Sequence, residues 1–195
     1  LNFNSPYKAF SISDFWKRWH ISLSSFLRDY LYIPLGGNRK GSLRRHANLM
    51  ITMLLGGLWH GASWNFVIWG GLHGMFLSVN HLFRSLTRNT PPRMPRWAGW
   101  LLTFTPVVFA WVFFRATSFS RAWEILQGMF GINGAVLPPH YMPLALGKHF
   151  LSFLGVDFSY PPFWALVGGK KEILALFFCF FIVLALSNSY EWCRG

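Results

Sequence analysis

The sequence predicts an all-α fold, a polytopic bundle of transmembrane helices with amphipathic helices at the membrane interface. Three observations predict it. Hydrophobic residues make up 53% of the 195 residues and charged residues only 12%, against about 25% charged in a typical soluble domain. Aromatic residues reach 19%, more than a soluble fold of this size could bury. Long apolar runs alternate with short basic ones, as membrane spans alternate with their loops.

The formal charge of +12 comes largely from basic clusters that stand between the apolar runs. Clustered lysine and arginine are typical of nucleic-acid-binding proteins and also of cytoplasmic loops in membrane proteins. Their position between candidate spans favours the second explanation, so we expect no nucleic-acid partner. The two cysteines, Cys179 and Cys193, do not indicate a disulfide framework. Because the chain starts with Leu and lacks a signal-like stretch, we expect a fragment of a longer protein.

The first segment, residues 1–46, is predicted to hold an interfacial amphipathic helix and a basic loop. Residues 11–14 offer a serine, Ser11 or Ser13, or Asp14 as the N-cap of the helix. Its apolar residues recur every three to four positions, at Phe15, Trp16, Trp19, Leu23 and Leu27. Residues 33–38 predict a turn that ends the helix, and the basic loop follows at residues 39–46.

Residues 47–83 are predicted to form a membrane hairpin. The segment is almost free of charge and is too long for one crossing, which takes about 20 residues. Residues 61–63 offer a break between two helical pieces. Basic residues on both outer flanks place both flanks on the cytoplasmic side. Because non-helical backbone at membrane depth is tolerated where it is buried in protein or lines a cavity, the tip of the hairpin can lie inside the protein.

The rest of the chain predicts two further spans and an outer segment, so that residues 1–195 form one membrane domain. Residues 97–114 and 172–187 are apolar and form the spans. Residues 115–171 are rich in Gly and Pro, with an amphipathic stretch near 119–130. They carry fewer basic residues, which places them on the outer face.

His60 is the first candidate for chemistry. It lies in an apolar stretch, where an ionisable side chain is costly to bury and is a functional hypothesis by default. Burial favours the neutral imidazole, which is the form that a general base needs. A histidine that only forms hydrogen bonds between helices is the alternative. Trp59 and Asn65, close to His60 in the sequence, are assigned to substrate binding.

Three further positions carry chemistry-bearing side chains. His20 is the second candidate, although from the residues alone an interfacial histidine beside Trp and Arg explains it better. His73 lies in an apolar span, and we expect it to be structural. Asp29 is assigned to substrate binding, with an ion pair to Arg28 or Arg39 as the alternative.

Several site types have no signature in the sequence. There is no cysteine pair at ligand spacing, no His-Glu-x-x-His and no carboxylate cluster, so we predict no metal site. There is also no Gly-rich phosphate loop and no Gly-x-Ser-x-Gly elbow. With only six acidic residues, a paired-carboxylate mechanism has little to draw on.

Five sequence blocks within residues 10–120 resemble a known family, and the rest of the chain resembles it only loosely. They read FWKRWHISLS at 15–24, LRDYLYIPLGGNR at 27–39, GLWHGASW at 57–64, WGGLHG at 69–74 and WVFFRA at 111–116. Together they resemble the membrane-bound O-acyltransferase family, in particular the bacterial branch that contains the alginate O-acetylation proteins. The D-alanyl transfer proteins of teichoic acid synthesis are also similar.

The resemblance implies that His60 is the family's central histidine and that His20 is its second polar site. The resemblance also implies amino-terminal membrane helices, which we expect to lie in a part of the protein before residue 1. The resemblance also implies a multi-pass protein of the bacterial inner membrane that transfers an acetyl group to hydroxyls of an exported polysaccharide such as alginate. The implied donor is acetyl-CoA or another acyl thioester, with no bound cofactor. The implied partners are membrane lipid, the donor, and the polysaccharide or a periplasmic protein that relays the acetyl group.

In this mechanism we expect His60 to remove the proton of the acceptor hydroxyl. His20 either donates to the developing oxyanion or positions the donor. The alternatives are D-alanyl transfer to teichoic acid, a transporter or channel whose histidines line a polar path, and a non-catalytic scaffold. Trials with acetyl-CoA and with a D-alanyl carrier thioester as donors distinguish acetyl transfer from D-alanyl transfer. Flux without covalent transfer would indicate a transporter or channel, and unchanged function of a His60 variant would indicate a scaffold.

Overall fold

The computed structural model describes residues 1–89, 94–130, 132, 135–136, 156–157, 170–186 and 188. The chain divides into two compact units, Leu1–Ala122 with Ser187–Gly195 and Trp123–Leu186. The described elements are helical apart from one two-residue pair of parallel strands. The predicted all-α class is therefore confirmed, whereas the complete transmembrane bundle stays a prediction.

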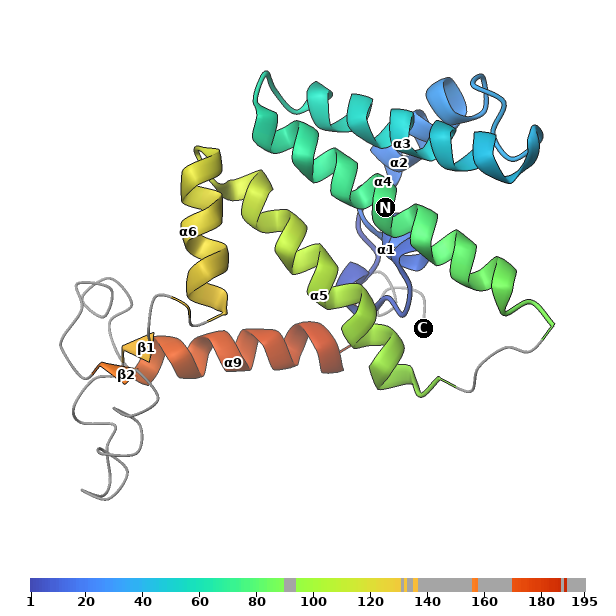
Figure 1. Ribbon diagram of the computed structural model, residues 1–195. Helices are drawn as coiled ribbons and strands as arrows, with labels where there is room; N and C mark the ends of the chain where they lie inside the picture. The colour runs from blue at the N-terminus through green and yellow to red at the C-terminus, as the bar shows by residue number, and fades with distance from the viewer. Residues whose placement is uncertain are drawn as a thin grey trace. The chain divides into compact units, whose positions relative to one another are not determined.

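Figure 1 labels the α-helices and strands, and the 3-10 and π-helices η1 and η2 lie between them in the chain order given next. In chain order, the first unit contains the 3-10 helix η1 (Pro6–Lys8), α1 (Ile12–Arg18), α2 (Ile21–Phe26), the π-helix η2 (Leu27–Tyr32), α3 (Gly41–Trp59), α4 (Trp64–Leu86) and α5 (Arg96–Arg115). The boundary between the units falls within α6 (Phe119–Met129). The second unit contains β1 (Ala135–Val136), which pairs in parallel with β2 (Val156–Asp157), and α9 (Lys170–Ala185).

The start of the chain differs from the single amphipathic helix that the apolar spacing predicts. Of the caps that the sequence offers, Ser11 caps α1, since its side chain accepts a hydrogen bond from the backbone N–H of Asp14. The helix then stops at Arg18, and the backbone of His20 is left-handed, with φ 42° and ψ 59°. A second helix starts at Ile21. The prediction of one continuous helix is therefore wrong, because hydrogen bonds from the first residues of the chain satisfy the backbone at the break.

The helices α3 and α4 lie side by side and are joined by a tight turn (Figure 1). The turn falls at the predicted break, and Ser63 caps α4 by accepting from the N–H of Asn65. Gly57 and Gly70 let the two backbones approach, because a Cβ at either position would collide with a main-chain oxygen of the other helix. The predicted basic loop is shorter than expected, because α3 already begins at Gly41.

A hydrophobic core joins the short first helices of the chain to the long ones. It contains Ala9, Ile12, Phe15, Trp16, Met53, Trp69, Leu77, Val107 and Ala110. Two described helices, α4 and α5, are long and apolar enough to cross a membrane. In α9 the residues Leu174–Ala185 form a shorter apolar helix. Of the predicted outer segment at 115–171, the structure describes α6, at the expected amphipathic stretch, and the two short strands; most of the remainder lies outside the described residues.

Candidate functional site

One cavity of the first unit brings His20 and His60 together. Its volume is about 440 Å³. It is lined by Tyr7, Trp16, Trp19, His20, Leu23, His60, Trp69, Trp111, Phe114 and Arg115. These residues come from η1, α1, α2, the break at Trp19 and His20, the turn after α3, and helices α4 and α5. The walls are mostly aromatic, and the two imidazoles and one guanidinium are their strongest polar groups.

His60 lies in the turn that joins α3 to α4 and is half-buried. Gly61 follows it with φ 152°, a conformation that residues with a Cβ rarely adopt. The ring centroid of His60 lies 5.2 Å from that of Trp69 and 5.0 Å from that of Phe114, both nearly edge-on. Within the described part of the chain the imidazole has no hydrogen-bond partner. An imidazole that lacks a protein partner and lines a cavity is available to a ligand.

His20 reaches the same cavity from the break between α1 and α2. Its Nδ1 lies 3.4 Å from the hydroxyl oxygen of Ser22. The ring of Phe3 packs against it, with 5.8 Å between the ring centroids. Histidine is one of the few residue types that are enriched in the left-handed backbone conformation, which helps to explain how the break accommodates it.

Tyr7, Trp111 and Arg115 line the cavity but are not among the predicted site residues. The ring of Tyr7 packs edge-on against that of Trp111, with 5.5 Å between the centroids. Arg115 is the last residue of α5 and is exposed. The block WVFFRA, which contributed to the family resemblance, contains two of these residues and was the available signal. Tyr7 had no such signal, because only the tertiary fold brings η1 to the histidines.

Asp29 lies outside this cavity, on η2. Its carboxylate accepts two hydrogen bonds from the neighbouring Arg28, with Nε–Oδ1 at 2.7 Å and Nη2–Oδ2 at 3.1 Å. The hydrogen bond from Arg28, together with its charge, lowers the pKa of Asp29. Both side chains are exposed, so the structure places Asp29 in the surface ion pair that was the alternative to substrate binding.

Trp59 and Asn65 are close to His60 but do not line the cavity. Trp59 is 66% exposed, and its ring centroid lies 5.1 Å from that of His60. Asn65 is buried, and its side-chain Nδ2 donates to the carbonyl of Ala116 at 2.9 Å. This bond ties the start of α4 to the end of α5, so Asn65 helps to hold the two cavity walls together.

His73 occupies the core and not the cavity. It is 0% exposed, and its Nδ1 accepts a hydrogen bond from Trp16 Nε1 at 3.3 Å. Its ring stacks on Phe15, with 6.2 Å between the centroids. Burial, a hydrogen bond at Nδ1 and aromatic packing are features of a structural histidine, and the expected structural role of His73 stays a prediction that they support.

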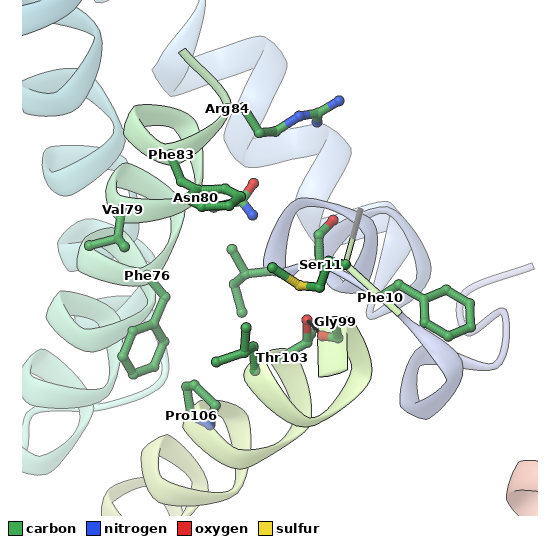
Figure 2. A pocket seen from close by; sticks show the side chains of 13 residues that line it. Phe10, Ser11, Phe76, Val79, Asn80, Phe83, Arg84, Gly99, Thr103 and Pro106 are labelled. Carbon is green, nitrogen blue, oxygen red and sulfur yellow. Dashed lines mark hydrogen bonds between the residues drawn. The ribbon is translucent and has the colours of Figure 1, made fainter. Parts of the chain in front are cut away.

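A second and larger cavity, of about 630 Å³, lies between α4 and α5 beside the start of α1. Figure 2 shows Arg84 at one end of it and Pro106 at the other. Its lining includes Phe76, Val79, Phe83 and Thr103 but no histidine. Among the described residues, no group of three or more His, Cys, Asp or Glu side chains could hold a metal ion. Of these two cavities, the smaller one is lined by histidines.

Comparisons with known proteins identify the family of the chain. Residues 1–122 match the family model of the membrane-bound O-acyltransferases. The chain is 54% identical to a peptidoglycan O-acetyltransferase of Helicobacter pylori over 137 residues, which cover 70% of this chain and 26% of that protein. It is 52% identical to a probable alginate O-acetylase of Pseudomonas aeruginosa over 132 residues, 68% of this chain and 25% of that protein.

A more distant relative carries out a different transfer. The chain is 33% identical to a teichoic acid D-alanyltransferase of Streptococcus thermophilus over 87 residues, 41% of this chain and 21% of that protein. The chain spans about a quarter of the length of its curated relatives. The family model nevertheless covers His20, His60 and the whole cavity. The resemblance predicted from the sequence blocks is thus confirmed, and the chain belongs to the membrane-bound O-acyltransferase family.

Proposed function

We propose that the full-length protein is an O-acyltransferase that transfers an acetyl group toward hydroxyls of an exported cell-envelope polysaccharide such as alginate. The observation that carries the proposal is that His20 and His60 line one mostly aromatic cavity in a chain of this family. The relatives named as O-acetyltransferases of peptidoglycan and alginate support acetyl as the group transferred.

In the proposed reaction His60 acts as the general base. One nitrogen of its neutral imidazole takes the proton of an acceptor hydroxyl as the hydroxyl oxygen attacks the thioester carbonyl. The tetrahedral intermediate then collapses, the carbon–sulfur bond breaks, and the imidazolium returns the proton to the leaving thiolate. The products are an ester and a free thiol. No oxidant or further reactant is needed.

The walls of the cavity suit this step. Trp69 and Phe114 flank the ring of His60 and can keep bulk water from competing with the acceptor hydroxyl. Arg115 is the cation of the cavity and is suited to an anionic part of a reactant, because a guanidinium binds phosphate and carboxylate through paired hydrogen bonds. His20 orients one of the two reactants.

The donor, the partners and the location form part of the same proposal. The donor is acetyl-CoA or another acyl thioester from the cytoplasm, and the protein binds no cofactor. The acceptor is the polysaccharide itself or a periplasmic protein that relays the acetyl group. Membrane lipid surrounds a multi-pass protein in the bacterial inner membrane, a location that the apolar helices α4 and α5 support. We propose no nucleic-acid partner.

D-alanyl transfer to teichoic acid is the second candidate function. The observation that favours it is the 33% identity to the D-alanyltransferase. The two functions use the same chemistry at His60 and differ in the donor. Because identity to the O-acetyltransferases is higher and extends over more of the chain, acetyl transfer is the better-supported proposal.

Donor trials with the full-length protein in membrane vesicles test the proposal. Labelled acetyl-CoA and a D-alanyl carrier thioester are supplied on the cytoplasmic side, and label in ester linkage on the outer side is measured. We expect transfer from acetyl-CoA, and its loss in His60→Ala. The matched control is His81→Ala, because His81 lies on α4 of the same hairpin but does not line the cavity.

Each outcome discriminates between the candidates. Transfer only from the D-alanyl thioester would replace the first function with the second. Label that crosses the membrane without forming an ester would indicate a transporter. Near-native transfer by His60→Ala at normal expression would remove His60 from the mechanism.

A further inference from the structure

The start of α2 is capped by a residue from another part of the chain. His20 occupies the N-cap position, but its side chain makes no capping hydrogen bond, although the first N–H groups of a helix need acceptors. The N–H of Ile21 donates to the main-chain oxygen of Asn2 at 2.9 Å. The N–H of Ser22 donates to the side-chain Oδ1 of Asn2 at 3.0 Å. Asn2 therefore does the capping, and the imidazole of His20 is released for the cavity.

The same first residues hold the break in place. The N–H of Asn4 donates to the carbonyl of Arg18 at 2.9 Å, which satisfies an acceptor at the end of α1. The ring of Phe3 packs against the rings of Trp19 and His20, with centroids 5.0 Å and 5.8 Å away. Residues 2–4 thus support the left-handed backbone that directs His20 away from the helix.

The hydrogen bonds at Asn2 have a consequence for the protons. A backbone N–H can only donate, so the atom of the Asn2 amide that faces Ser22 is the oxygen and not the nitrogen. The hydroxyl oxygen of Ser22 also lies 3.0 Å from this oxygen. An amide oxygen cannot donate, so the single hydroxyl proton of Ser22 goes to Asn2. Toward Nδ1 of His20, 3.4 Å away, the Ser22 oxygen is then left to accept.

We propose that Asn2, acting through Ser22, sets neutral His20 in the tautomer that carries its proton on Nδ1. The other nitrogen, Nε2, is then the acceptor that His20 offers to the cavity, since the hydrogen bond made by one ring nitrogen decides the role of the other. Asn2 and Ser22 are positioning residues. The proposal rests on the proposed function and selects one role for His20: it accepts a hydrogen bond from a hydroxyl or amide N–H of a reactant and does not donate to the oxyanion.

We call the hydrogen bonds from Asn2 through Ser22 to His20 the relay. Ser22→Ala in the full-length protein tests the relay separately from the capping of α2 by Asn2. The substitution removes the hydroxyl but keeps the backbone N–H of Ser22 and its bond to Asn2. We expect kcat for acyl transfer to fall about tenfold, by analogy with the low end of the loss when a partner that orients a metal-binding histidine is removed. KM for the donor and the melting temperature should change little. Ser22→Thr, which keeps a hydroxyl, should recover most of kcat.

A double substitution and a matched control complete the test. Asn2→Ala removes both the cap and the end of the relay, so the double variant with Ser22→Ala should have the kcat of Asn2→Ala alone, because groups acting as one unit are not additive. Ser25→Ala, on the same helix but outside the cavity, should match the wild type.

Two results would overturn the relay: a wild-type kcat in Ser22→Ala, or reductions by the two single substitutions that multiply in the double variant. A variant of His60 run in parallel identifies which idea has failed. If His60→Ala is active, the proposed function fails. If His60→Ala is inactive while Ser22→Ala and wild type are alike, only the relay fails.

Discussion

His60 and His73 lie in similar sequence and in different surroundings. Both stand in apolar, glycine-containing stretches, and both rings contact Trp69, whose centroid is 5.2 Å from that of His60 and 4.9 Å from that of His73. His60 lines a cavity and has no protein hydrogen-bond partner in the described chain. His73, in contrast, is fully buried, and its Nδ1 accepts a hydrogen bond from Trp16.

The difference shows that apolar sequence around a histidine does not decide its role. What decides it is whether another part of the fold provides a partner and closes the space around the ring. For His73, α1 contributes Trp16 and Phe15. For His60, the break after α1 leaves room that is shared with His20. We therefore expect substitutions at the two positions to affect different measurements.

The largest effect on stability is expected for His73→Ala. The substitution empties a fully buried site and leaves the indole N–H of Trp16 without its acceptor. Together these effects should destabilise the protein by about 3 kcal/mol. A lower melting temperature of the purified full-length protein would show it. Loss of acyl transfer at a native melting temperature would instead make His73 functional and remove the contrast with His60.

A smaller loss of stability is expected for Asn65→Ala. The carbonyl of Ala116 loses its side-chain donor, which should cost about 1–2 kcal/mol, while KM for the acyl donor stays unchanged. Thermal unfolding and steady-state kinetics on the same preparation check both. A raised KM with native stability would support the substrate-binding role assigned to Asn65 from the sequence.

The smallest effect is expected for Asp29→Asn. The pair with Arg28 is exposed, and solvent weakens such pairs. Because Arg28 lowers the pKa of Asp29, the pair is present at neutral pH, and its small contribution is lost only as the pH falls through that lowered pKa. Transfer by Asp29→Asn should stay within about twofold of wild type, since charge pairs on the surface contribute little. A larger fall at native stability would place Asp29 in the site.

Local patterns in the sequence predicted the features that depend on local interactions. A serine or aspartate cap before Phe15, the turn before α4 and the helical class follow from hydrogen bonding and periodicity within a few residues. The break at His20 could not be predicted in this way, because Asn2 and Asn4 form the bonds that stabilise it. The apolar spacing continues through the break and therefore predicts one continuous helix where the structure has two.

The candidate site also has a part that the sequence predicts and a part that only the tertiary fold shows. The sequence blocks identify His20 and His60 as candidates, but their spacing of 40 residues does not predict that they line the same cavity. Tyr7 and Arg115 join them only because η1 and the end of α5 meet at the cavity. Asn65 was assigned to substrate binding for its closeness to His60, whereas its side chain faces the end of α5.

The most direct measurement compares the rate of acyl transfer per folded molecule in His60→Ala and His73→Ala, with the melting temperature of each. For His60→Ala we predict a fall of about 100-fold or more, as expected on removal of a general base, at a melting temperature close to wild type. For His73→Ala we predict a lower melting temperature and a rate per folded molecule near wild type. A near-native rate in His60→Ala would contradict the assignment of the cavity as the acyl-transfer site.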